Sequence, residues 1–228
     1  MRLEEGIMTV KEPTEVSHHI RTQHAFMFLC VLGLFWLPLN SVDRVFAAGE
    51  AIGTAKNAIG GFMVVRSDGI EEQLEGKGAL PLFEGDVLMT EGSSQAMIEF
   101  NNGIKVALNE NTMFTILSRW EKSKGFTRVL RLKYGEVWVD TQGGPKPLEI
   151  ETPVATAAVK GTEFDLLVSP DGQSTLTVIN GIVEFGTAFG TCPIKTSKIS
   201  YGNRGKKCTK PQPINVSPTI AWTQGIRQ

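Results

Sequence analysis

The chain has 228 residues and a formal net charge of −1, with 41% hydrophobic and 21% charged residues. This length is enough for one domain that buries a substantial core without help from disulfides. The balanced charge excludes the strongly basic footprint expected of a protein that binds nucleic acid or anionic lipid.

An apolar stretch near the N-terminus predicts an export signal. Residues 25–39 (AFMFLCVLGLFWLPL) are 15 residues long and are followed by Val45 and Ala47, small residues at the two positions that a signal peptidase reads. A membrane-spanning helix needs about 20 apolar residues. We therefore expect a signal peptide over residues 1–47, cleaved after Ala47, and a periplasmic or secreted protein with no stable membrane span. An uncleaved short anchor is the alternative.

The histidines bear on catalysis because all three (His18, His19 and His24) lie in the predicted signal peptide. The remaining chain, 48–228, carries 19 basic and 19 acidic residues and no histidine. This excludes Ser–His and Cys–His nucleophile pairs and zinc sites built on histidine.

The acidic residues are scattered. Glu149 and Glu151 share one strand face and are the nearest approach to a glycosidic or calcium-binding pair, but such alternation is typical of a solvated face. Loops that cradle phosphate, calcium-loop spacings and a GxSxG motif are all absent from the sequence. We expect no enzyme activity, no cofactor and no metal.

Short alternating apolar runs closed by glycine turns predict an all-β domain over residues 61–187, after a flexible lead-in at 48–60. The clearest hairpin joins runs 96–100 and 104–108 through a type I′ turn at Asn102-Gly103. Polar residues 71–78 predict a loop or hairpin edge, and Tyr134-Gly135 predicts a chain reversal. About a dozen strands without helical periodicity favour a sandwich or a rolled, β-helix-like barrel.

The order and spacing of these turns resemble the FecR domain of bacterial envelope proteins. The most specific part is Thr152-Pro153, a small-residue strand, and then Gly161-Thr162-Glu163-Phe164. We expect structural roles here, because proline suits a strand start and glycine permits a bulge or positive φ. The motif residues are Gly85, Asp86, Gly103, Gly135, Thr152, Pro153, Gly161, Thr162, Phe164 and Gly181.

The resemblance implies a non-catalytic binding or signalling domain, similar to sensors of iron-siderophore uptake that contact an outer-membrane receptor. Only 24 residues precede the apolar stretch, too few for the cytoplasmic part that regulates a sigma factor in such sensors. The expected partner is an envelope protein, with an outer-membrane receptor among the candidates. The alternative is a stand-alone periplasmic glycan-binding or scaffolding protein, for which Trp120 and Trp222 are candidate aromatic platforms.

Residues 188–228 are predicted to lie outside the β domain, as a basic loop followed by a proline-rich tail. In an exported chain Cys192 and Cys208 predict one disulfide, with free thiols or an intermolecular bridge as alternatives. The enclosed loop contains no acid and predicts either a docking element for an anionic partner or a solvated surface. Its basic residues are Lys195, Lys198, Arg204, Lys206 and Lys207.

Overall fold

The structure, a computed structural model, describes residues 49–121, 125–143 and 147–227. The predicted signal peptide and its cleavage site lie outside these residues and stay predictions. Across the described ranges, no helix combines the length and the apolar character that a membrane crossing requires.

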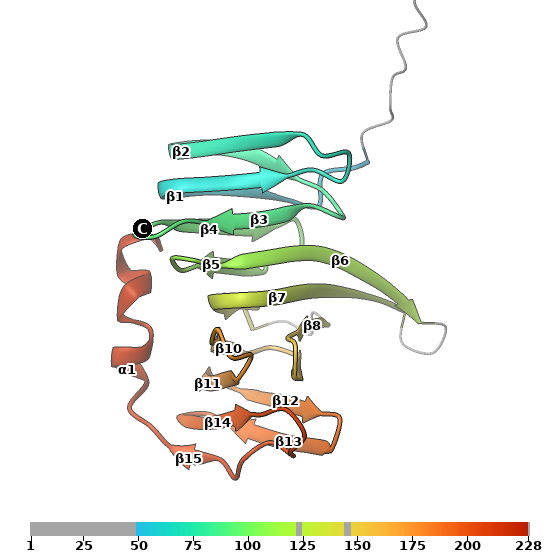
Figure 1. Ribbon diagram of the computed structural model, residues 1–228, viewed down its shortest axis with the longest axis vertical. Helices are drawn as coiled ribbons and strands as arrows, with labels where there is room; N and C mark the ends of the chain where they lie inside the picture. The colour runs from blue at the N-terminus through green and yellow to red at the C-terminus, as the bar shows by residue number, and fades with distance from the viewer. Residues whose placement is uncertain (1–48, 122–124, 144–146, 228) are drawn as a thin grey trace, which may run out of the picture. The chain divides into compact units, whose positions relative to one another are not determined.

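Nearly all of the regular structure is β, which confirms the predicted fold class (Figure 1). The strands are β1 (Gly53–Val65), β2 (Glu71–Leu82), β3 (Val87–Thr90), β4 (Gln95–Phe100), β5 (Lys105–Leu108), β6 (Met113–Glu121), β7 (Gly125–Asp140), β8 (Leu148–Glu151), β9 (Ala155–Val159), β10 (Glu163–Val168), β11 (Ser174–Asn180), β12 (Ile182–Thr187), β13 (Gly190–Lys195), β14 (Lys198–Gly202) and β15 (Gln212–Pro213). Two short helical segments follow, α1 (Val216–Thr219) and the 3-10 helix η1 (Ala221–Gly225).

The strands form two layers that share their long members. Layer A runs β4–β5–β7–β10–β11–β14–β15, and layer B runs β3–β6–β7–β8–β9–β12–β13. Strand β1 pairs with β4 through its first half and with β3 through its second half, while β2 pairs along both halves of β1. The result is a β-sandwich whose layers are joined through β1, β2 and β7.

Strand β7 passes from one layer to the other at Gly135. Residues before it pair with β6 and β8, whereas residues after it pair with β5 and β10. The chain reversal predicted at Tyr134-Gly135 is therefore wrong, because the strand bends there and continues. Gly135 has a φ of +94°, and a Cβ atom would lie 2.7 Å from the carbonyl oxygen of Asn111 and would overlap the backbone of Thr112. Only glycine meets both conditions.

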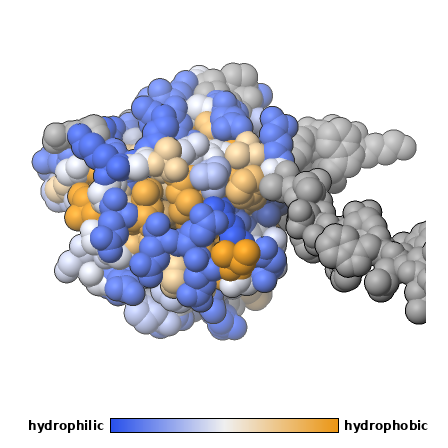
Figure 2. Space-filling model, turned by 90° about the horizontal axis from the view of Figure 1, so that it is seen from above, coloured by the Kyte–Doolittle hydropathy of each residue, from blue (hydrophilic) through white to orange (hydrophobic). Residues whose placement is uncertain are grey.

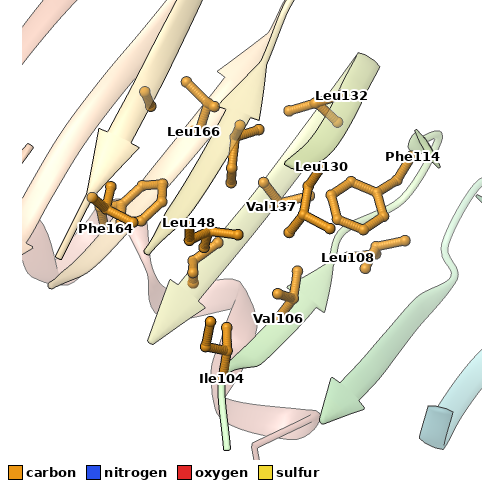
Figure 3. Close-up of a cluster of buried hydrophobic side chains, with 14 of the residues drawn as sticks. Ile104, Val106, Leu108, Phe114, Leu130, Leu132, Val137, Leu148, Phe164 and Leu166 are labelled. Carbon is orange, nitrogen blue, oxygen red and sulfur yellow. The ribbon is translucent and has the colours of Figure 1, made fainter. Parts of the chain in front are cut away.

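The core fills the space between the layers with alternating side chains from both (Figure 3). Ile104, Val106 and Leu108 of the predicted hairpin are fully buried, which confirms its register. The turn type is different from the prediction. Phe100 pairs with Ile104 around three residues, and only Gly103 has positive φ. A type I′ turn would also require positive φ at Asn102.

One N-terminal prediction is wrong, and for residues 71–78 the hairpin edge is confirmed over the alternative of a loop. Residues 53–60 are not a flexible lead-in, since they form the first half of β1 between β2 and β4, where Ala55 and Ala58 are buried. Residues 71–78 belong to strand β2, which is an edge strand and is largely exposed. Charges and glycines are typical of edge strands because they discourage pairing with other chains. Seen from this end, hydrophilic residues surround smaller apolar areas (Figure 2).

The predicted domain end at residue 187 is also wrong. Strands β13 and β14 extend layers B and A, and Ile194 and Ser200 are fully buried. Pro193 lies within β13. This strand pairs only with β12 and lies at an edge of the sheet, where proline is tolerated.

Candidate functional site

The most specific motif residues form turns. Thr152 Oγ1 accepts a hydrogen bond from the backbone N–H of Ala155 at 2.9 Å and another from Ser174 Oγ at 2.7 Å. Pro153 lies in this turn between β8 and β9 rather than at the start of a strand, and its ring is exposed. Phe164 is fully buried in the core.

The turns at Gly161-Thr162 and Asn180-Gly181 meet each other. Both glycines have positive φ, and a Cβ atom on Gly181 would lie 2.8 Å from Thr162 Cγ2. Thr162 also donates its backbone N–H to Thr141 Oγ1 at 2.7 Å. These contacts give the motif residues a packing role.

Gly85-Asp86 is a turn with a buried ion pair. Gly85 has a φ of +92°, and Asp86 Oδ2 accepts from Arg66 Nη1 at 2.5 Å and from the backbone N–H of Phe83 at 2.8 Å. The Arg66 guanidinium also pairs with Glu72 at 2.7 Å. This arrangement ties β1 and β2 to the start of β3.

The predicted disulfide between Cys192 and Cys208 is present. Both cysteines are buried and belong to the main core cluster, so the bridge holds the loop after β14 against β13. Thr187 Oγ1 donates to the carbonyl of Lys206 at 2.8 Å, and the Lys207 side chain covers Gly190. The basic loop is thus attached to the β12–β13 hairpin.

The predicted docking residues do not form one cluster. Lys195 and Lys198 lie together where β13 ends and β14 begins, whereas Arg204, Lys206 and Lys207 follow the other end of β14. Because Lys198 is the first of the five residues of β14, four strand residues separate the two groups, or roughly 13 Å at about 3.3 Å per residue. Phe189, which is 60% exposed, lies beside the second group at the tip of the β12–β13 hairpin. We call Phe189, Arg204, Lys206 and Lys207 the basic tip.

Charge is strongly segregated along the chain. Residues 48–184 contain 12 basic and 19 acidic residues, whereas residues 185–228 contain seven basic residues and no acid. Within the described residues, none of the three cations of the basic tip forms an ion pair. The equal numbers of basic and acidic residues over 48–228 therefore conceal a C-terminal excess of positive charge, in which the cations of the basic tip are unpaired among the described residues.

A groove of about 830 Å³ lies at the bend of β7. Its walls include Asn109, Tyr134, Glu136 and Leu167, and Arg204 of the basic tip reaches its rim. Tyr134 and Leu167 are more than one third exposed, so the groove offers aromatic and aliphatic surface beside amide and carboxyl groups.

The C-terminal segment covers the outer face of layer A, which sequence reasoning missed. Ile226 packs with Met97, Ala107 and Trp138, and Trp222 and Ile220 border this cluster. Arg227 stacks over the Trp138 ring at 4.0 Å and lies 3.5 Å from Glu163, which accepts from the Trp138 indole at 3.0 Å. The one sequence feature that could have indicated this contact is the presence of three large apolar residues, Ile220, Trp222 and Ile226, in the C-terminal segment. Trp222 is half-buried here, which weakens its candidacy as a glycan platform.

A buried carboxyl group, that of Asp165, lies next to Trp222 of this segment, and Glu136 neighbours it. Asp165 is 2% exposed, and its Oδ2 has no hydrogen-bond partner among the described residues. Burial raises the pKa of Asp165 well above its ordinary value, and the neighbouring carboxyl of Glu136 raises it further. Burial also raises the pKa of Glu136, although Asn109, which donates to Glu136 at 2.5 Å, acts in the opposite direction.

Potential metal ligands of the described residues do not gather at one place. No group of three or more His, Cys, Asp or Glu side chains among these residues is arranged to hold a metal ion. Glu151 pairs with Arg131 at 2.9 Å on the outer side of layer B, as expected of a solvated strand face. The side chain of Trp120 lies outside the described residues.

The architecture is a β-sandwich in which most of the motif residues form turns. Comparison with known proteins places it in the same fold class. Residues 86–184 match the family model described as FecR protein. This match, over 99 of the 228 residues, confirms the resemblance read from the motifs. No curated protein matches the sequence.

Among solved structures, the fold is similar to two crystal structures of a putative anti-sigma factor from Parabacteroides distasonis. Both have a TM-score of 0.51, with 19% and 18% sequence identity. Each alignment covers 61% of this chain and 65% or 64% of the other, so the chain spans less than two thirds of those proteins. At this identity the similarity establishes the fold alone.

Proposed function

We propose that the chain is an exported, non-catalytic binding module of the bacterial envelope that takes part in signalling through a protein partner. The FecR domain supports a signalling or regulatory class, and the two structural neighbours titled putative anti-sigma factor are consistent with it. In this proposal the chain works in the periplasm.

The main support for this proposal is the composition of the basic tip. Three exposed cations without acidic partners stand beside an exposed aromatic ring, and a disulfide holds the loop in place. Arginine and aromatic side chains are enriched at protein interfaces. A complementary acidic surface would be attracted by the unpaired charge and would bury Phe189.

The test compares partner capture by matched variants in envelope extract. Arg204→Gln/Lys206→Gln/Lys207→Gln should lose the captured protein, whereas Lys195→Gln/Lys198→Gln should retain it, because that pair lies at the other end of β14. Both variants should keep the wild-type melting curve. Capture unchanged in both would show that the basic tip is an ordinary solvated surface.

Glycan binding is the second candidate, and the groove favours it. Tyr134 offers a partly exposed ring next to the amides and carboxylates of Asn109, Asn111 and Asp171, a combination suited to sugar hydroxyls. Titration with soluble cell-wall glycan fragments should then give saturable binding that Tyr134→Ala abolishes. No binding by the wild-type protein would exclude this candidate.

A further inference from the structure

The C-terminal segment crosses layer A from β15 toward β4, over strands that come from distant parts of the chain (Figure 1). We call residues 216–227 the strap. Beneath it, Met97, Ala107 and Trp138 point away from the sandwich core and are nevertheless buried. The strap therefore closes an apolar face that would be open without it.

The buried side chains of the strap, Thr223 and Ile226, lie near its C-terminal end. Helix α1 has four residues and none of them is buried, and η1 has five with only Thr223 buried. Isolated helices of this length do not persist in water. Attachment depends on Ile226, on Arg227 against Trp138 and Glu163, and on the bond from Gln95 Nε2 to the Trp222 carbonyl at 3.2 Å.

A polar mismatch lies under the same segment. The Trp222 indole N–H lies near the Asp165 carboxyl and acts to lower its pKa, but neither Trp222 Nε1 nor Asp165 Oδ2 has a well-formed hydrogen bond to a described residue. Buried groups without partners are costly, and a buried charge without a partner costs more still. Opening the strap would return both atoms to water.

We propose that the strap is a displaceable cover whose docking is coupled to the proton held by the Asp165–Glu136 pair. When the strap is closed, Asp165 is buried beside a second carboxyl group and keeps its proton. When the strap opens, water reaches Asp165 and the proton leaves. Rising pH therefore favours the open strap and uncovers Met97, Ala107 and Trp138, while falling pH favours the closed one.

Other charges surround the strap and must be separated from this effect. Glu99, Lys56, Lys105, Asp140 and Arg227 border the cleft at its end, and Glu163 contacts Arg227. The hydrogen bond from Lys56 lowers the pKa of Glu99. All these groups are the same in wild type and Asp165→Asn, so the comparison of the two cancels their contribution.

The test is hydrogen exchange of the full chain between pH 5 and 9, followed by mass spectrometry of peptides covering residues 214–227. After correction for intrinsic exchange, the opening constant of the wild-type strap should rise by up to tenfold per pH unit, as expected for release of one proton. In Asp165→Asn the strap should stay protected and its opening constant should be flat with pH. Glu184→Gln removes an exposed acid of β12 in layer B and should behave as wild type.

Peptides from β11 report whether each variant is folded. An equal pH dependence in wild type and Asp165→Asn, with β11 protected in both, would overturn the proposal. A strap that exchanges at the same rate in both proteins at pH 9 would overturn it as well.

Discussion

The bend of β7 gives the sharpest test of the fold. Gly135→Ala imposes two costs, and the structure allows them to be measured separately. A side chain at a φ of +94° costs about 1–2 kcal/mol of stability. The new Cβ would also lie 2.7 Å from the Asn111 carbonyl oxygen and overlap Thr112, and relieving such overpacking typically costs about 1–3 kcal/mol. We expect a total loss of about 2–5 kcal/mol.

Gly69→Ala is the matched control. Gly69 has a similar φ of +88°, but nothing lies within 4 Å of its Cβ position. It should lose only the conformational part, about 1–2 kcal/mol. Urea unfolding of both variants at one pH measures the difference. Equal losses would show that Gly135 does not hold the two layers together by close approach, and the account of β7 would fail.

The remaining predictions concern the core, the disulfide, pH and export. Val106→Asp should unfold the domain, since Val106 is fully buried and a buried unpaired charge costs several kcal/mol. Lys105→Gln should change the melting temperature little. The reverse ranking of the two melting temperatures would mean that the strand register is wrong. Cys192→Ser/Cys208→Ser should lose up to about 3 kcal/mol in urea unfolding, because the loop spans 16 residues and both cysteines belong to the core; an unchanged midpoint would contradict this. Burial raises the pKa of Asp165 in the folded state, so the free energy of unfolding of the wild type should fall as pH rises from about 4. Asp165→Asn should fall less steeply with pH. Identical dependence on pH in the two proteins would contradict the burial of a protonated Asp165. N-terminal sequencing of exported protein should begin at Ala48 or Gly49, and a species retaining residues 26–39 would refute cleavage.

The control at Lys105 shows what pairing adds to a sequence argument. Alternation alone marks Lys105 as outward-facing, which suggests that any polar substitution is harmless. In the sheet Lys105 lies between Glu99 of β4 and Asp140 of β7. An aspartate there would face two carboxylates, and like charges directly opposite destabilise a sheet. Glutamine is therefore the informative control.

Local patterns predicted the strands well wherever apolar residues alternate and a glycine ends the run. These patterns gave wrong predictions where the conformation of a segment depends on strands that are distant in the sequence. Gly135 looks the same in a sequence whether the strand reverses or bends into the other layer. Ala55 and Ala58 carry little hydrophobic signal, yet they are buried because β2 and β4 pair on either side of them. Small side chains become core residues through what covers them.

Asp165 shows the same limit at the candidate site. Its place between Phe164 and Leu166 predicts an outward-facing, solvated carboxylate, and the side chain does point away from the sandwich core. Outward-facing positions of layer A are not solvated, however, because residues more than 50 positions later in the chain fold back over them. The alternation of side chains along a strand assigns each residue to one face of the sheet. It does not show whether another segment of the chain covers that face. An ionisable residue kept under such a cover costs stability, and we infer that this cost makes the strap easier to release than an all-apolar face would allow.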